Sequence, residues 1–414
     1  MPAAEKTVQN TERRSRRIRL AAVFASVLGA TLLWTVSSPR AGGFGALDAW
    51  LGQDDGVLVT DTQGLEVYAW HADLPLVPAS TLKLLTALVS RHELGAGHRF
   101  CTEFYLTEDR HLKIKGYGDP LLISEEVDWI AGILSATLTE IEDVVADDSY
   151  FQNPLTIPGV NDSLEPYDAP NGALCVNFNS VAFRSSGGAF VSGEPETPLL
   201  PMVLDRIRSS GLKRGRIPLS REKGETARYA GALFAHFLQR RGVRVRGGIR
   251  NGNVDPKRDR LIYRHHSRYS MDEAIGKMLE YSNNFIANQL LLASGARRYG
   301  PPGDLEKGAR TAAAYAREQL GLESIRIVEG SGISRKNRIS ARQLLVVLQA
   351  FEPHRHLLTR EGGDAFKTGT LRGVRSRVGY LSTDSGRQYR YAVLFNTSKR
   401  DPVEVVRLLQ RHLP

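Results

Sequence analysis

The sequence predicts an α+β fold, in which a helical body lies beside an antiparallel sheet and a large inserted region interrupts the chain. An apolar helical stretch spans residues 80–94, a second helix begins at Ser270, and strand-like alternation follows residue 365. The texture between these parts is different, with short strand-like pieces and many turns. A length of 414 residues suits one large domain with an insertion, or two to three domains.

The first forty residues have the pattern of an export segment. An uncharged run of 17 residues, Leu20–Val36, follows a basic cluster. Its length fits either a cleaved signal peptide or a short membrane anchor, and both place the following residues in the periplasm or on the outer face of the cytoplasmic membrane. The basic cluster consists of Arg13, Arg14, Arg16, Arg17 and Arg19.

The charge of the chain argues against nucleic acid as a partner. Residues 1–40 supply +5 of the net charge of +10, so the exported remainder is only mildly basic. This bias is compatible with anionic wall or lipid surfaces. No basic stripe with interleaved aromatic residues is present, and an exported protein rarely meets a genome.

Two cysteines, Cys101 and Cys175, are the whole complement of the chain. Outside the cytoplasm they can form a disulfide, and two separately buried thiols fit equally well. Two cysteines cannot hold a structural zinc ion alone, and no histidine spacing typical of a zinc site accompanies them. We therefore expect neither a metal nor a cofactor. The adjacent His265 and His266 are expected at the surface, before a helix.

Three segments are predicted along the chain. Residues 41–100 and 256–414 form one discontinuous domain, and residues 101–255 form the inserted material. Within the discontinuous domain, Ser270 and Glu273 form a capping box that begins a helix ending near residues 282–284. Strands are expected at 365–371, 376–381 and 389–395, and an amphipathic helix at 403–413. Within the insertion, strands are expected at 103–106 and 112–115.

A Ser-x-x-Lys motif occurs three times, at Ser80/Lys83, Ser210/Lys213 and Ser220/Lys223, so context must separate them. Ser80 opens a strongly apolar helix, in which positions i and i+3 share a face and the helix N-terminus favours negative charge. The other two serines are followed closely by glycine or proline and have the composition of turns. Ser80 is therefore the predicted nucleophile.

Two further motifs occur once each: Ser282-Asn283-Asn284, and Lys367-Thr368-Gly369 in a predicted strand. The ordered set Ser-x-x-Lys, Ser-x-Asn, Lys-Thr-Gly is found in penicillin-binding proteins and serine β-lactamases. Lys83 can act as base if burial and the charge of Lys367 destabilise its ammonium. Ser282 can relay a proton and Asn284 can hold a substrate amide. Lys367 and Thr368 can receive a C-terminal carboxylate, Gly369 allows close approach of a peptide backbone, and the N–H groups of Ser80 and Thr370 can form an oxyanion hole.

From about residue 46 to the C-terminus, the sequence resembles the D-alanyl-D-alanine carboxypeptidase/endopeptidases, the class C low-molecular-mass penicillin-binding proteins. The resemblance is carried by segments 78–87, 116–120, 146–151, 166–170, 177–179 and 330–337. It implies a penicillin-binding/serine β-lactamase-like transpeptidase fold, a Ser80 acyl-enzyme, peptidoglycan peptides as substrates and covalent binding of β-lactams. The gap of 202 residues from Ser80 to Ser282, against 85 from Ser282 to Lys367, implies the class C insertion.

Two departures from that family stand out. The insertion is abbreviated after Asn179, so that an expected subdomain is reduced to residues 181–218. Glu329 stands where aspartate is expected before Gly-Ser-Gly, and we expect this conservative change to preserve activity.

Three functions are open to such a chain. The leading one is a serine D-Ala-D-Ala carboxypeptidase, with D,D-endopeptidase action on cross-links as an extension. A β-lactamase-like hydrolase is the first alternative, although no Glu-x-x-Leu-Asn stretch lies between Ser282 and Lys367 to position a hydrolytic water. A non-catalytic wall-binding protein is the second, although decay normally removes the nucleophile or base first and both are present.

Overall fold

The computed structural model describes residues 44–397 and 400–413. The predicted export segment and the question of signal or anchor therefore lie outside the described residues. Among the residues described, no helix is long and apolar enough to cross a membrane.

One six-stranded sheet, in the order β13-β14-β15-β16-β1-β2, is built from strands within residues 55–70 and 359–395. It pairs the chain's first strands with its last, because β1 and β16 lie antiparallel from Asp55↔Phe395 to Asp61↔Tyr389. Apolar side chains alternate along β16: Ala392 and Leu394 face a helical core, while Val393 and Phe395 face a smaller one. The strands are β1 Asp55–Asp61, β2 Glu66–Trp70, β13 Thr359–Glu361, β14 Asp364–Leu371, β15 Val374–Ser382 and β16 Gln388–Phe395.

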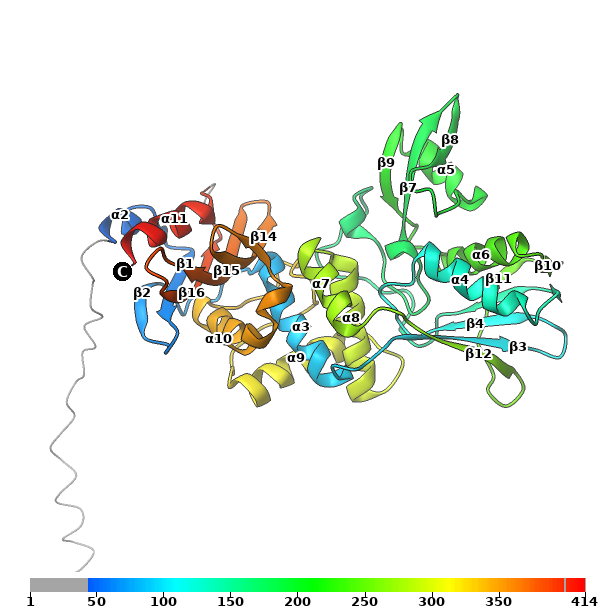
Figure 1. Cartoon of the computed structure of the whole chain (residues 1–414), viewed down its shortest axis with the longest axis horizontal. Helices are drawn as coiled ribbons and strands as arrows, with labels where there is room; N and C mark the ends of the chain where they lie inside the picture. Colours follow the sequence, from blue (N-terminus) through cyan, green and yellow to red (C-terminus); the bar gives the residue numbers. More distant parts are fainter. Residues whose placement is uncertain (1–43, 398–399, 414) are drawn as a thin grey trace, which may run out of the picture. The chain divides into compact units, whose positions relative to one another are not determined.

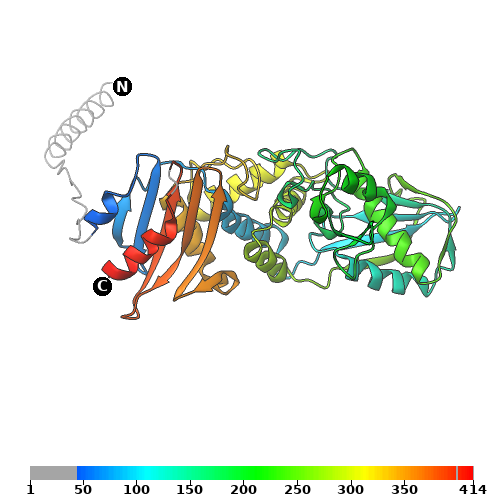
Figure 2. The same cartoon turned by 90° about the horizontal axis from the view of Figure 1, so that it is seen from above.

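Helices cover both faces of this sheet (Figures 1 and 2). The C-terminal helix α11 Pro402–His412 packs on β15 and β16, and α10 Ala341–Phe351 packs on the opposite face. Helix α8 (Asn284–Tyr299) is buried over most of its length, because Ile286, Leu290 and their neighbours pack against α3 (Lys83–Leu94) and α9 (Leu305–Leu320). The remaining helices of this region are α2 Gly45–Asp48 and α7 Met271–Glu280.

The inserted region has its own hydrophobic core, built around Phe104, Phe234 and Leu238. A five-stranded sheet, β11-β6-β4-β3-β12, is covered by helices α4 and α6. Its last strand, β12 Arg260–His266, comes from beyond residue 255, so the segment that leads from the insertion to α7 completes this sheet. Its other strands are β3 Cys101–Leu106, β4 Leu112–Gly116, β6 Val144–Asp147 and β11 Ile249–Asn251, and its helices are α4 Ser124–Ser135 and α6 Glu225–Arg240.

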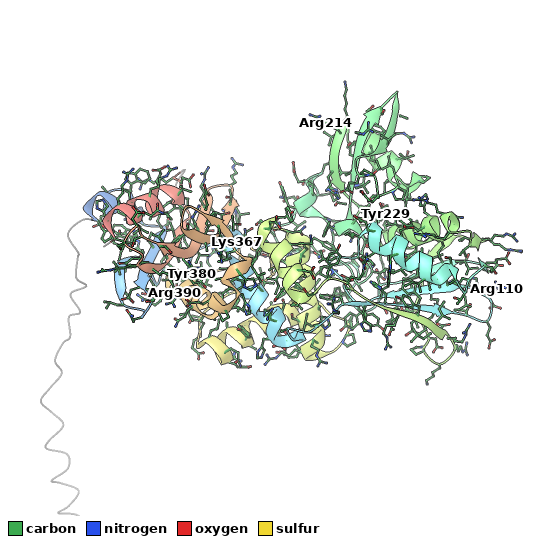
Figure 3. All side chains as sticks on the ribbon, in the orientation of Figure 1. Arg110, Arg214, Tyr229, Lys367, Tyr380 and Arg390 are labelled. Carbon is green, nitrogen blue, oxygen red and sulfur yellow. The ribbon has the colours of Figure 1, made fainter. Side chains whose placement is uncertain are left out.

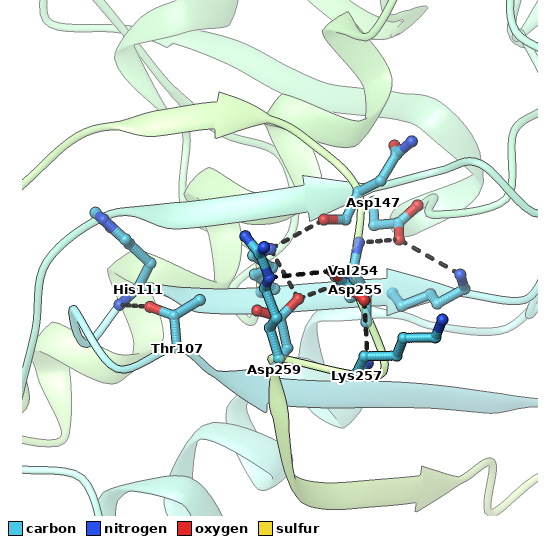
Figure 4. Close-up of polar contacts among 11 residues, drawn as sticks. Thr107, His111, Asp147, Val254, Asp255, Lys257 and Asp259 are labelled. Carbon is cyan, nitrogen blue, oxygen red and sulfur yellow. Dashed lines mark hydrogen bonds and ion pairs between the residues drawn. The ribbon is translucent and has the colours of Figure 1, made fainter.

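The return segment is fixed by hydrogen bonds to Asp147 at the end of β6 and to Asp259, which lies just before β12 (Figure 4). Asp147 accepts a hydrogen bond of 2.7 Å from the Val254 N–H, and Asp259 accepts one of 2.6 Å from the Asp255 N–H. Lys113 donates to the same Asp259 carboxylate at 2.7 Å. These buried charge-assisted bonds hold the chain where it leaves the insertion.

A small sheet, in the order β8-β7-β9, stands in the abbreviated part of the insertion. Its strands are β7 Ser180–Ser186, β8 Ala189–Ser192 and β9 Arg214–Pro218, and the short helix α5 Leu204–Ser209 joins them. A two-stranded pair, β5 Glu140–Ile141 with β10 Arg244–Val245, completes the region.

The predicted elements are confirmed in their order and type, and two local expectations are wrong. Residues 79–82 form a 3-10 turn, and the α-helix starts only at Lys83. His265 is buried within β12, 3.3 Å from Glu126, whereas His266 is exposed. The surface expectation for His265 failed because β12 extends the inserted sheet beyond residue 255. Cys101 and Cys175 are both free thiols in the structure.

Candidate active site

Ser80 lies in a tight turn that is locked by its neighbours. Ala79 immediately before it has a positive φ of 49°, a backbone conformation that non-glycine residues rarely adopt. A Cβ on Gly332 would lie 1.8 Å from the Ala79 carbonyl oxygen, so only glycine fits there. The segment containing Gly332 therefore lies directly against the Ser80 turn.

The 3-10 turn brings Lys83 directly beside Ser80, because side chains at i and i+3 eclipse in this geometry. Lys83 Nζ lies 2.9 Å from Ser80 Oγ. It also donates to Asn284 Oδ1 at 2.8 Å and to the Ser331 carbonyl at 2.7 Å. A neutral amine has two N–H donors and one lone pair, so the last two partners occupy the donors and leave the lone pair for the Ser80 hydroxyl.

The environment favours that neutral amine. Lys83 is fully buried, and its pKa is lowered well below the usual lysine range, first by burial and second by the like charge of Lys367. Buried Glu329 acts in the opposite direction and raises the pKa of Lys83. A lysine with a depressed pKa beside a serine hydroxyl is the arrangement that nucleophilic catalysis requires.

Ser282 and Lys367 form the opposite side of the site. Ser282 has a positive φ of 50° and lies in the short break between α7 and α8. Its hydroxyl lies 3.0 Å from Lys367 Nζ, which also donates to the Thr368 carbonyl at 3.0 Å. Burial lowers the pKa of Lys367 to about 8. Figure 3 shows the Lys367 side chain on β14.

Gly369 fits closely against the nucleophile turn. A Cβ at this position would lie 2.7 Å from the Ser80 nitrogen and 2.9 Å from the Ala79 Cβ. The glycine thus allows β14 to approach the Ser80 turn, a reason different from the substrate contact expected from the sequence. Thr368 and Thr370 alternate with it and are exposed.

The outer edge of β14 is open beside the site. Strand β13 pairs only with residues 364–366, and no other described strand pairs with residues 367–371 on that side. An open edge presents unpaired backbone N–H and C=O groups to which an extended peptide can bind.

Glu329 is a contributor that sequence reasoning did not assign a role. It is buried and accepts hydrogen bonds from the N–H groups of Ser331, Gly332 and Ser334. Asn337 donates to it at 2.7 Å. Because the Ser331 carbonyl receives a Lys83 N–H, Glu329 holds the loop that orients the base. The Gly-Ser-Gly segment beside it was the available signal.

A cavity of about 610 Å³ adjoins Ser282 and Asn284. Aromatic side chains of the inserted loops, Tyr167 and Phe178, line it together with Tyr269. The Asn284 side-chain amide donates to the Tyr167 carbonyl at 3.4 Å. The inserted region therefore contributes directly to the surroundings of the site. The sequence did not predict this contribution.

The predicted residues thus lie around one centre. The structure brings together Ser80, Lys83, Ser282, Asn284 and Lys367, and packs Gly369 against them. The other two Ser-x-x-Lys serines serve local structure. Ser210 Oγ donates to the Ile207 carbonyl at 2.6 Å, and Ser220 Oγ accepts from the Glu222 N–H at 3.0 Å. No group of residues suited to hold a metal ion is found in the described part of the chain.

Comparison with known proteins identifies the family of the chain. The model of the family described as D-Ala-D-Ala carboxypeptidase 3 (S13) matches residues 46–213 and 207–360. The chain belongs to this S13 family. It is 29% identical over 340 residues to a D-alanyl-D-alanine carboxypeptidase from Actinomadura sp. strain R39, covering 70% of this chain and 63% of that protein. The S13 chain thus spans less than two thirds of the length of this relative.

Solved structures of similar proteins share the S13 chain's fold. Penicillin binding protein 4 (dacB) from Haemophilus influenzae is similar with a TM-score of 0.72 at 19% identity, covering 88% of this chain and 97% of that one. A second structure of that protein, complexed with a novel β-lactam, has a TM-score of 0.66 at 18% identity, with the same coverage. The predicted penicillin-binding type of α+β fold is therefore confirmed.

Proposed function

We propose that this S13 chain is a serine D,D-peptidase that hydrolyses D-alanyl peptide bonds of peptidoglycan through an acyl-enzyme on Ser80. The observation that carries the proposal is the hydrogen-bonded contact of the Ser80 hydroxyl with the buried, pKa-depressed Lys83. The carboxypeptidase descriptions of the family and of the Actinomadura relative agree with this chemistry.

In the proposed acylation step, Ser80 Oγ attacks the carbonyl carbon of the penultimate D-alanine, and its proton passes to the neutral Lys83 amine. The C–N bond of the tetrahedral intermediate then breaks, and a proton delivered through Ser282 leaves with the amine of the terminal D-alanine. Backbone N–H groups of Ser80 and Thr370 hold the oxyanion in this scheme. Water afterwards hydrolyses the ester and regenerates the serine.

Substrate binding follows from the surroundings of the nucleophile. An extended peptide pairs with the open edge of β14 at Lys367–Leu371. Its terminal carboxylate lies against Lys367 and Thr368, and Asn284 holds the peptide amide. The terminal carboxylate makes carboxypeptidase action the leading reaction, and D,D-endopeptidase action on cross-links uses the same steps with a longer leaving group.

β-Lactams are the second ligand class in this proposal. They carry a strained amide and a carboxylate, so they meet the same nucleophile and the same Lys367, and acylate Ser80. The β-lactam complex of the Haemophilus protein supports this assignment by fold. A β-lactamase-like hydrolase would need rapid deacylation as well, and the first test below separates the two.

The proposed substrate also places the protein in the cell envelope. We propose that residues 1–40 export the chain, as a signal peptide or a membrane anchor, to the periplasm or the outer face of the cytoplasmic membrane. We also propose the division into a catalytic domain, residues 41–100 with 256–414, and inserted material at 101–255. Separate hydrophobic cores support that division, whereas the pairing of β12 with β3 extends the inserted sheet past residue 255.

Covalent labelling tests the proposal. Purified wild-type protein is expected to gain the mass of one penicillin and to release D-alanine from a pentapeptide ending in D-Ala-D-Ala. Ser80→Ala should lose the label and roughly 10⁴-fold or more of the peptidase rate. Ser210→Ala, which alters another Ser-x-x-Lys serine, is the matched control and should behave as wild type.

Three outcomes would contradict this assignment. Label that persists on Ser80→Ala would place the nucleophile elsewhere. Fast steady-state hydrolysis of penicillin without release of D-alanine would support a β-lactamase, and wild-type protein without any label would support a non-catalytic wall-binding protein.

A further inference from the structure

The small sheet of the insertion has two unlike faces. One face is buried, and Val181, Phe183 and Ile217 pack from it into the inserted core. The other face carries Arg184 on β7 and Arg214 on β9, both exposed, and Arg216, which is half-buried. The reduced part of the insertion therefore keeps a folded sheet whose outer face is basic; the Arg214 side chain is labelled on it in Figure 3.

Arg184 and Arg214 lie directly opposite each other in the strand register. Like charges at directly opposed positions destabilise a sheet. The structure shows no ion pair or hydrogen bond from either guanidinium group to another described side chain. This pair therefore costs stability and receives no compensation within the described residues.

Several other arginines of the insertion are paired with carboxylates. In the basic stretch 240–250, Arg241 pairs with Asp128, Arg244 with Glu140 and Arg250 with Asp143. On the small sheet itself, Arg216 pairs with Glu194. Carboxylates thus accompany these arginines, whereas Arg184 and Arg214 have no carboxylate partner among the described residues and remain available to an anionic partner from outside.

The position of this face suggests which anion. Ser180, Glu194 and Arg216 line the cavity of about 610 Å³ that also contains Ser282 and Asn284. Ser180 and Arg184 lie on the same strand face, four residues or about 13 Å apart. The basic face therefore continues outward from the cavity beside the catalytic serine.

We infer that Arg184 and Arg214 form a docking surface for the carboxylates of a second peptide stem of peptidoglycan, while the first stem occupies the Ser80 site. This inference rests on the proposed function. Guanidinium groups bind carboxylates in bidentate fashion, and each stem peptide ending in D-alanine carries a free carboxylate. Neighbouring stems belong to one polymer, so even weak binding of the second raises the local concentration of the first.

The double variant Arg184→Gln/Arg214→Gln tests the surface. On a soluble peptide ending in D-Ala-D-Ala, its kcat/KM should equal that of wild type, because neither arginine lies at the nucleophile. On isolated peptidoglycan, its KM should rise about five- to tenfold. Added salt should weaken the wild type on the polymer and affect the variant less.

A matched control removes two other exposed arginines, Arg387 on the β15–β16 turn and Arg411 on α11, for which the structure likewise shows no side-chain partner among the described residues. Arg387→Gln/Arg411→Gln has the same change in net charge and should act on both substrates as wild type. If this control loses as much activity on peptidoglycan as the Arg184/Arg214 variant, the effect is due to overall net charge and the inference is overturned.

Three further results would overturn it. The first is unchanged activity of the Arg184/Arg214 variant on the polymer, and the second is an equal loss on the soluble peptide. The third is that the Arg184/Arg214 variant no longer binds vesicles containing phosphatidylglycerol but still cleaves peptidoglycan as wild type does. The partner of the two arginines would then be a phosphate-bearing lipid. Co-sedimentation of Ser80→Ala protein with insoluble peptidoglycan, with and without the two arginine changes, tests docking even if the proposed activity fails.

Discussion

At the scale of single residues, a lysine is converted into a base by its partners. Lys83 is enclosed, and its two N–H donors are taken by Asn284 Oδ1 and the Ser331 carbonyl. Glu329 fixes that carbonyl by accepting backbone N–H groups of the same loop. Glu329 stands where the family resemblance implies an aspartate. Its longer side chain accepts the N–H groups of Ser331 and Gly332, as expected for a conservative replacement.

The two lysines give the reaction a defined pH dependence. Acylation needs neutral Lys83, so its rate should fall as the pH drops through the depressed pKa of that amine. Binding of a carboxylate substrate needs charged Lys367, so KM should rise as the pH exceeds about 8. Rates of penicillin acylation and KM values for a D-Ala-D-Ala peptide, measured across pH, separate these two limbs.

Lys367→Gln checks the electrostatic link between them. Removal of the like charge raises the pKa of Lys83, so the acidic limb of acylation should move to higher pH. Loss of the carboxylate contact should also lower kcat/KM for the peptide by roughly 10²-fold. An acidic limb that stays in place would show that the Lys367 charge does not act on the base.

At the scale of elements, the site depends on the approach of a strand to a turn. Gly369 of β14 and Gly332 of the preceding loop contact the Ser80 turn where any Cβ would collide. The open edge of β14 then lies beside the nucleophile. Glycine is therefore needed here for packing between elements.

Gly369→Ala should separate β14 from the Ser80 turn. The expected result is a fall in the acylation rate of about tenfold or more, because displacement of a reacting group by a fraction of an ångström is costly. Thermal unfolding should show that the free energy of unfolding falls by about 1–3 kcal/mol, because the new Cβ is forced against the Ser80 turn. Gly45→Ala is the control, because a Cβ at Gly45 would meet no atom within 4 Å. Gly363 is not used, because its φ of +81° would strain an alanine. Wild-type acylation by Gly369→Ala would contradict this role.

At the scale of the whole molecule, the insertion helps to build the site. The loop at 166–172 reaches α8, where Asn171 donates to the Phe285 carbonyl and to Gln289 Oε1, both at 3.0 Å. Gln289 in turn donates to the Gly172 carbonyl at 3.0 Å. These buried bonds tie the loop that carries Tyr167 to the helix that carries Asn284.

Asn171→Ala should therefore affect both stability and substrate binding. Loss of the amide leaves two buried acceptors without their donor. The free energy of unfolding, measured with urea, should therefore fall by about 1–3 kcal/mol. KM for the peptide should rise, while the exposed control Asn253→Ala should leave both quantities unchanged. A stability loss without any change in KM would mean that the loop does not contribute to the substrate site.

The sequence by itself determined the order of elements and the chemical identity of the site. Capping at Ser270, strand alternation after residue 365 and the ordered motifs depend on neighbouring residues, and local pattern records them. Only the tertiary structure decided the 3-10 form of the Ser80 turn, the burial of His265, the role of Glu329 and the contact of Tyr167 with Asn284. Most of these depend on groups that meet across long stretches of chain, such as Gly332 against the Ser80 turn, His265 beside Glu126 and Tyr167 beside Asn284, where packing and desolvation act. The role of Glu329 had a local signal in the Gly-Ser-Gly segment, but only the structure shows that its loop carries the Ser331 carbonyl to Lys83.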